Sequence, residues 1–382
     1  MRELLLLWLV GLCLRITVLA IPPVIPQLHA SFAMSQAMVG ALTSLPVLLF
    51  SFAAIPGSLL VSRFGPAHVM SAGILITAAA GAARGLSPSL AVLFLTTFAM
   101  GFGIAIMQPA LPAVVREWTP QRVALGIVVY SNGLLVGEAF SASLTIPFVL
   151  PMTGGDWRLA LAAWSVPVAI FGVLAAIETW RRHEPRGTSE AKPWWPDWRN
   201  PLTWKLGLLS GYASALYFGT NAFLPDFLAA RGRPELLNPA LAALNWVQLP
   251  ASFLMLAFAD RLTMRRWPFL SLGVLSIAAT LALVGLPVGT TVWWTGILGF
   301  CNAFLLILTM ALPPLLAEAR DVHRLSAAMI AIGYLSAFVV PIAGGALWDL
   351  TRLPASGFAP ILLFGLAAMF LAATLRFPAR AR

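Results

Sequence analysis

The stretch Gly73-Ile-Leu-Ile-Thr-Ala-Ala-Ala-Gly-Ala-Ala-Arg-Gly-Leu86 recurs, with substitutions, as Gly273-Val-Leu-Ser-Ile-Ala-Ala-Thr-Leu-Ala-Leu-Val-Gly-Leu286, about 200 residues further along the chain. The tripeptide Ala110-Leu-Pro112 returns at nearly the same offset as Ala311-Leu-Pro313. A shared offset between long apolar segments indicates internal duplication. We therefore predict two related halves that carry equivalent hydrophobic helices in the same order.

The composition places these helices in a membrane. Hydrophobic residues make up 60% of the chain and charged residues 10%, and the mean hydropathy is +0.88. Apolar stretches of about 20 residues, the length that crosses a bilayer, fill most of the sequence. We predict an all-α membrane protein with 12 transmembrane helices in two pseudo-symmetric six-helix halves. The expected spans are 4–27, 38–61, 67–86, 90–115, 121–150, 157–180, 204–229, 240–260, 267–287, 290–317, 324–349 and 355–377.

The net charge of +10 follows the predicted topology rather than marking a nucleic-acid surface. With the N-terminus inside the cell, 18 of the 24 Lys and Arg residues fall in cytoplasmic segments. This positive-inside bias predicts that both termini are cytoplasmic. The remaining basic residues are Arg15, within the membrane, and five expected on the outer side: Arg84, Arg158, Arg231, Arg233 and Arg352.

The longest polar interval divides the chain into three parts. We predict an N-terminal half at 1–180, a linker at 181–203 and a C-terminal half at 204–382. The linker mixes basic residues with tryptophans, including Trp194, Trp195 and Trp198. Such a segment suits the anionic cytoplasmic face of the lipid bilayer.

The sequence carries no signature of an enzyme. The two lysines, Lys192 and Lys205, follow Ala191 and Trp204, so there is no Gly-Lys pair of an ATP-binding loop. No His-Glu-x-x-His motif is present, and the interval between the halves leaves no room for a soluble catalytic domain. We therefore expect no catalytic residues, no cofactor, no metal and no nucleic-acid partner.

Arg15 is the most informative single residue. It falls in the middle of the first apolar stretch, where an arginine costs about 2.5–3.5 kcal/mol on insertion scales, so it must face the protein interior. Its planar, permanently charged guanidinium suits a carboxylate or another small anion. Two interpretations remain open: coordination of an anionic solute, or a structural ion pair.

Glu138 is the one acidic residue deep inside a predicted helix of the first half. It can neutralise Arg15 or carry a coupling proton, as buried carboxylates do in transporters. Both roles, alone or together, stay open at this point.

Polar side chains at similar depth complete the candidate site. Tyr217 and Asn221 are four residues apart and so share one helix face. In hydrocarbon each polar group needs a partner, from a neighbouring helix or from a solute in a cavity. Besides Arg15 and Glu138, the candidate solute-binding residues are Tyr217, Asn221, Gln248, Asn302 and Asn132; Gln108, Asn245 and Tyr334 lie at comparable depth.

Short motifs resemble a known superfamily. Ser62-Arg63-Phe64-Gly65 follows the second predicted span and resembles the Asp-Arg-x-Gly signature of the major facilitator superfamily, with Ser62 in place of the acid. Ala259-Asp260-Arg261 ends the eighth span, at the equivalent position of the second half, and keeps the acidic-basic pair. The resemblance implies the major facilitator fold.

A narrower resemblance is to the cyanate/2-nitroimidazole transporter family. It rests on Leu14-Arg15 with Ile21-Pro-Pro-Val-Ile-Pro26, on Gly40-Ala-Leu-Thr-Ser-Leu-Pro46, on Gly101-Phe-Gly-Ile-Ala-Ile-Met-Gln-Pro-Ala-Leu-Pro112 and on Tyr217-Phe-Gly-Thr-Asn-Ala-Phe-Leu-Pro225. The resemblance implies small anions or nitro-heteroaromatics as solutes, with the first-helix arginine of the family at Arg15. Gln108 and Glu138 depart from the family pattern near the expected pocket, which implies a different solute.

A second motif keeps another transport function open. Gly126, Gly133 and Gly137 match part of the fifth-helix signature of proton-driven drug antiporters, although Glu138 replaces its proline. The prediction is a monomeric, multi-pass secondary transporter of the bacterial inner membrane that moves a small, anionic or polar molecule by alternating access. Its alternative is a proton-coupled efflux antiporter of amphipathic neutral or cationic compounds.

Overall fold

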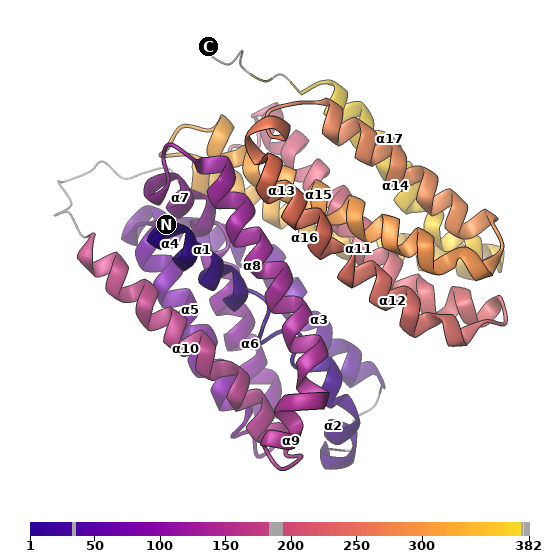
Figure 1. Cartoon of the computed structure of the whole chain (residues 1–382), viewed down its shortest axis with the longest axis horizontal. Coiled ribbons are helices and arrows are strands. Elements are labelled where there is room, and N and C mark those ends of the chain that lie inside the picture. The colour runs from indigo at the N-terminus through magenta and orange to yellow at the C-terminus, as the bar shows by residue number, and fades with distance from the viewer. Residues whose placement is uncertain (33–35, 183–193, 376, 378–382) are drawn as a thin grey trace. The chain divides into compact units, whose positions relative to one another are not determined.

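The computed structural model describes residues 1–32, 36–182, 194–375 and 377 (Figure 1). Within these ranges the chain is helical apart from short connections and contains no strand. It divides into two compact units: unit 1 comprises Met1–Pro196 and Ala317–Ala331, and unit 2 comprises Asp197–Leu316 and Ile332–Arg382. Residues 183–193 of the predicted linker lie outside the described residues, and the predicted domain boundaries stay a prediction.

Unit 1 contains ten α-helices, a 3₁₀ turn and a short π-helical segment in its first part, as far as the structure describes it. They are α1 (Arg2–Cys13), η1 (Pro22–Val24), α2 (Ile25–Phe32), α3 (Gln36–Phe52), α4 (Ala54–Phe64), α5 (Pro66–Arg84), α6 (Leu90–Met107), α7 (Ala110–Trp118), α8 (Val123–Leu144), η2 (Thr145–Val149), α9 (Leu150–Met152) and α10 (Trp157–Arg181).

Unit 2 holds the later helices, of which α16 begins in the segment grouped with unit 1. They are α11 (Pro201–Ala230), η3 (Pro234–Leu236), α12 (Leu237–Trp246), α13 (Gln248–Leu262), α14 (Trp267–Gly285), η4 (Val288–Thr290), α15 (Thr291–Leu316), α16 (Val322–Thr351), η5 (Pro354–Phe358) and α17 (Ala359–Ala373).

Ten of the twelve predicted spans have a counterpart that is long and apolar enough to cross a membrane. The described residues contain nine such helical segments, and the bent pair Leu45–Phe52 and Ala54–Phe64, which turns by 53°, makes a tenth. The seventh predicted span is α11, which has the length, but polar side chains such as Tyr217 and Asn221 lower its hydropathy. The first predicted span is interrupted.

The first predicted span is interrupted between α1 and α2. Helix α1 ends at Cys13, and residues 14–20 form turns before η1 begins at Pro22. Pro22 and Pro23 have no N–H, so they cannot bond the carbonyls four residues earlier, and their rings crowd those carbonyls. The two prolines therefore prevent a regular α-helix from running through to η1, and the turn segment before them carries Arg15.

The repeated stretches form equivalent helices, but one repeat has a break. Gly73–Leu86 lies largely in α5 and Gly273–Leu286 largely in α14, and both helices have 19 residues. The Ala-Leu-Pro repeat differs: the chain breaks before Ala110, whereas α15 continues through Ala311. Pro109 precedes the first copy and Met310 the second, so the first half loses an additional helical hydrogen bond.

Glycines let α1 and α8 pack backbone to backbone in unit 1. A Cβ on Gly11 would lie 2.1 Å from the carbonyl oxygen of Tyr130, and one on Gly133 would lie 2.2 Å from that of Trp8. Gly137 faces Leu12 in the same way, at 2.7 Å. Small residues at helix contacts are how membrane helices approach closely, and here they fix α8 against the segment that leads to Arg15.

The outward faces of the long helices are apolar. Leu95, Ile170, Leu363 and Phe370 are each more than half exposed. Large apolar side chains on the outside of long helices are placed for contact with lipid rather than water.

Inside unit 1, the segment that precedes α2 packs with α2, α6, α9 and α10 through a buried cluster that includes Val24, Leu28, Leu93 and Trp157.

Candidate functional site

Arg15 and Glu138 are brought together in unit 1. Arg15 lies in the turn segment after α1, and Glu138 lies on α8, whose glycines hold it against α1. The Nε atom of Arg15 is 4.0 Å from Oε2 of Glu138, and the two side chains are only 13% and 15% exposed. Charges in so little contact with water interact more strongly than at a surface.

The aromatic ring of Phe50, on α3, forms another wall of the Arg15 environment. The guanidinium carbon of Arg15 lies 5.1 Å from the centre of this ring. A cation over an aromatic face is attracted by the ring quadrupole. Arg15 is thus placed between an acid and an apolar wall, and this surrounding fixes the orientation of its guanidinium.

Asn132 is buried on α8 and bonded within unit 1. Its Oδ1 accepts a hydrogen bond of 2.8 Å from the indole Nε1 of Trp8, on α1. The sequence analysis identified Asn132 but not Trp8. This bond and the glycine contacts hold the same two helices, so Asn132 also positions the helix that carries Glu138.

Tyr217, Asn221 and Asn245 form one polar group in unit 2. The hydroxyl of Tyr217 donates to Oδ1 of Asn245 over 2.7 Å, and Nδ2 of Asn245 donates to the carbonyl of Leu241. Asn221 donates from Nδ2 to the carbonyl of Tyr217, one turn earlier on α11. Both α11 residues thus lie on one helix face, and the bond to Asn245 joins that face to α12.

Gln248 and Asn302 form the second polar group of unit 2. Nδ2 of Asn302, on α15, donates to Oε1 of Gln248, at the start of α13, over 3.2 Å. Both residues are buried. The four candidates of unit 2 therefore occur as two hydrogen-bonded groups, Tyr217 with Asn221 and Gln248 with Asn302.

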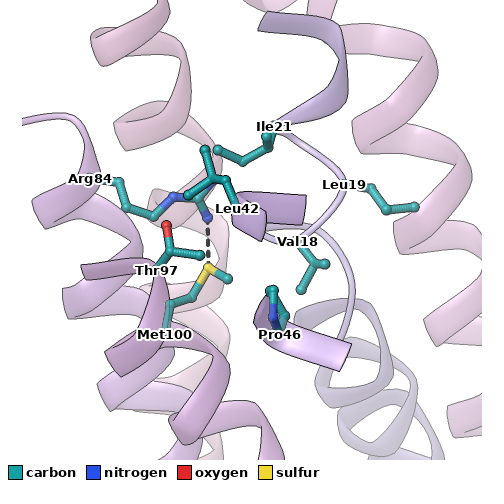
Figure 2. A pocket seen from close by; sticks show the side chains of 8 residues that line it. All are labelled: Val18, Leu19, Ile21, Leu42, Pro46, Arg84, Thr97 and Met100. Carbon is teal, nitrogen blue, oxygen red and sulfur yellow. Dashed lines mark hydrogen bonds between the residues drawn. The ribbon is translucent and has the colours of Figure 1, made fainter. Parts of the chain in front are cut away.

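One charged residue was not singled out in the sequence analysis. Arg84, expected at the outer end of the third span, is the last residue of α5 and is 1% exposed. It lines a cavity in unit 1, together with Thr97 and Met100 of α6 (Figure 2). An arginine at the end of an apolar stretch is typical of a residue that reaches water, so its burial had no signal in the local sequence.

The titratable residues do not form a metal site in the part of the chain that the structure describes. No group of three or more His, Cys, Asp or Glu side chains there could hold an ion.

Comparisons with known proteins agree with the sequence motifs. A family model described as Major Facilitator Superfamily matches residues 7–294. The cyanate transport protein CynX of Escherichia coli (strain K12) is 29% identical, with 90% of this chain and 89% of the relative covered. The 2-nitroimidazole transporter of the same organism is 27% identical, with 95% and 91% covered.

Solved structures show the same fold. The transporter FucP in its outward conformation matches with a TM-score of 0.74 at 12% identity, covering 97% of both chains. The proton:xylose symporter XylE matches with a TM-score of 0.72 at 13% identity, covering 96% of this chain and 94% of the other. The predicted all-α membrane fold and the predicted resemblance are confirmed. The chain belongs to the Major Facilitator Superfamily of membrane transporters.

Proposed function

We propose that the protein is a secondary transporter of a small organic anion or small polar solute. The observation that carries this proposal is Arg15, a guanidinium only 13% exposed in an apolar bundle, with Glu138 and Phe50 beside it. In such surroundings a small anion is bound more strongly than in water. The two relatives named for cyanate and 2-nitroimidazole, which align over most of the chain, support a solute of this size.

We assign the anionic or electron-rich end of the solute to Arg15. Tyr217, Asn221, Gln248 and Asn302 supply hydrogen bonds to its polar atoms, and Asn132 contributes from α8. Their existing bonds hold these groups in fixed orientations, which lowers the entropy lost when a solute binds. The solute is therefore recognised by few polar groups in largely apolar surroundings.

Glu138 is the proposed proton-coupling or charge-balancing residue. A carboxylate at 4.0 Å from Arg15 lowers the net charge around the guanidinium. When an anion binds Arg15, the carboxylate becomes a repulsive neighbour, and taking up a proton relieves that repulsion. Anion binding and proton uptake at this pair are thereby linked, and movement follows alternating access of the two halves of the fold.

The efflux alternative gains no support from its glycines. Gly133 and Gly137 are required for the close approach of α8 to α1, because a Cβ at either position would meet backbone atoms of α1. This packing explains two of the three glycines of the motif without a drug-antiport function. We therefore retain solute transport through Arg15 as the function.

The test is binding and uptake by the purified full chain. Cyanate and 2-nitroimidazole are titrated in thermal unfolding, with amphipathic cationic drugs alongside, on wild type and on Arg15→Ala. A ligand at 100 times its Kd stabilises the folded state by about 2.7 kcal/mol. Arg352→Ala is the control, since it removes an arginine at an exposed connection.

We expect stabilisation by an anion or by the nitroimidazole in wild type and in Arg352→Ala, and none in Arg15→Ala. Uptake of the same compound into proteoliposomes follows the same pattern. Stabilisation of both wild type and Arg15→Ala by cationic drugs alone would refute the proposal in favour of efflux.

A further inference from the structure

Arg84 is a buried cation with an incomplete set of partners. It is 1% exposed, at the end of α5. Its Nη1 donates to the carbonyl of Thr17 over 2.8 Å and to Sδ of Met100 over 2.7 Å. No carboxylate of the described residues lies within ion-pair distance of it.

Two donors of the same guanidinium remain unused. Nε and Nη2 of Arg84 are buried and have no hydrogen-bond partner. They lie on one edge of the planar group, the edge that binds two oxygens of an anion side by side. Arginine stays charged in proteins, so burial cannot be relieved by loss of the proton. Buried charges are normally paired and hydrogen-bonded, and the described residues supply no such partner on this edge.

The cavity beside Arg84 has room for such a partner. Its volume is about 60 Å³, several times the roughly 10–15 Å³ that holds one water molecule. Its walls come from α3, α5, α6 and the turn segment after α1 (Figure 2). The lining residues are Val18, Leu19, Ile21, Leu42, Pro46, Arg84, Thr97 and Met100.

Thr97 adds a third polar group to this cavity. Its side chain is fully buried, and Oγ1 has no hydrogen-bond partner. A helical threonine can bond the carbonyl one turn earlier, as Thr96 does with Val92. Arg84 and Thr97, which both carry unpartnered polar atoms, thus line the same cavity, whose other walls are mostly apolar.

We infer that this cavity in unit 1 binds a small planar monovalent anion, of the formate or nitrate type, on Arg84 and Thr97. Two oxygens accept from Nε and Nη2 of Arg84, and the hydroxyl of Thr97 donates a further bond. Arg84 is the one charged residue among the described residues that line the cavity. A single positive charge matches a monovalent anion and disfavours a divalent one such as sulfate.

This site does not depend on the proposed function. It uses a different arginine from the transport site, although Arg84 bonds the carbonyl of Thr17, two residues beyond Arg15. An anion held on Arg84 neutralises the charge that holds the turn segment in place. The two proposals can therefore fail separately.

The experiment is a thermal-unfolding titration of the purified full chain, first freed of small anions by exchange into gluconate. Sodium formate and sodium nitrate are the probes, and sodium sulfate at equal ionic strength is the control. The variants are Thr97→Val, which keeps the side-chain shape, Arg84→Met, which removes the charge, and Arg15→Ala.

We expect a saturable rise in Tm with formate or nitrate, and none with sulfate, in wild type and in Arg15→Ala. Thr97→Val should raise the apparent Kd about tenfold, the effect of losing one hydrogen bond to a charged group. Arg84→Met should lose the saturable response; if it does not fold, Thr97→Val and Arg15→Ala decide the question.

Equal responses to all three salts in every variant would overturn the inference. So would a response that is lost in Arg15→Ala and unchanged in Thr97→Val, because the anion would then sit at Arg15. Failure of solute uptake with the expected Tm pattern intact would count against the proposed transport function and not against the Arg84 site.

Discussion

Nε of Arg15 and Oε2 of Glu138 are 4.0 Å apart, and both side chains are largely removed from water. At this separation the contact is electrostatic, and it is too long for a hydrogen bond between these two atoms. A solute that binds Arg15 competes with this contact. The roles of Arg15 in binding and in structure can therefore be separated by substitution.

A double-mutant cycle tests which role dominates. Arg15→Gln leaves Glu138 without its charge partner and should lower the free energy of unfolding by about 1–3 kcal/mol. Arg15→Gln with Glu138→Gln removes both charges, so stability should return while uptake stays lost. The measurement is Tm together with uptake in proteoliposomes. Uptake that returns in the double variant would show that the pair is structural.

Asn132 and its partner can be separated by substitution. Trp8→Phe removes the indole donor and should lower stability by about 1 kcal/mol, because Asn132 then loses a buried bond. Solute affinity in this variant should change little. Asn132→Leu should in addition weaken solute binding about fivefold if the amide contacts the solute, as one hydrogen bond of about 1 kcal/mol implies.

Equal solute affinity in Trp8→Phe and Asn132→Leu would assign Asn132 to packing alone. Titration of the solute against both variants, monitored by thermal unfolding, supplies the comparison. A double variant with both changes should be less destabilised than the sum of the single ones, since the two groups share one bond.

The α1–α8 contact should be intolerant of a single methyl group. In Gly133→Ala the new Cβ would lie 2.2 Å from a backbone oxygen, so the helices must separate. Overpacking of this kind lowers the free energy of unfolding by about 1–3 kcal/mol. Gly285→Ala is the matched control on α14: nothing lies within 4 Å of its Cβ, and alanine favours helix. A Tm for Gly133→Ala equal to that of Gly285→Ala would contradict the packing argument.

The predicted orientation in the membrane can be read from two introduced cysteines. Glu235 and Glu318 are exposed residues in connections that the positive-inside rule places on opposite sides, outside and inside the cell. In whole cells, Glu235→Cys should react with an impermeant maleimide, and Glu318→Cys should react only after permeabilisation. The native Cys13 and Cys301 are buried and should give little background. The reverse labelling pattern would mean that both termini are outside.

The helical spans were largely predictable from sequence, because length and hydropathy decide them locally. The internal repeat also predicted correctly that α5 and α14 are equivalent helices, because a membrane helix makes its backbone hydrogen bonds within itself. The equivalence fails at Ala110, because Pro109 interrupts the helix there and the second half has no proline at the corresponding position. Pro22 and Pro23 explain why no regular helix runs on into α2, but they lie well beyond Cys13, and the local sequence does not explain why α1 ends at that residue.

The candidate site was predictable in its residues and not in their partners. Arg15 and Glu138 were recognised by their charge in an apolar context, but the bond of Asn132 to Trp8 spans 124 positions. Arg84 was missed for the same reason, since the carbonyl that it binds lies 67 positions away. Such contacts depend on helix packing, which neither periodicity nor composition encodes.

The early end of α1 has a consequence for biosynthesis. Twelve helical residues rise only about 18 Å, which is short of the roughly 30 Å of hydrocarbon that a membrane span must cross. The next residues include a charge and form turns, so this segment is a poor anchor when it first leaves the ribosome. Its stable packing requires α8, which ends at Leu144. The first segment to be synthesised therefore reaches its stable packing late, after the fifth predicted span, which contains α8, has also been synthesised.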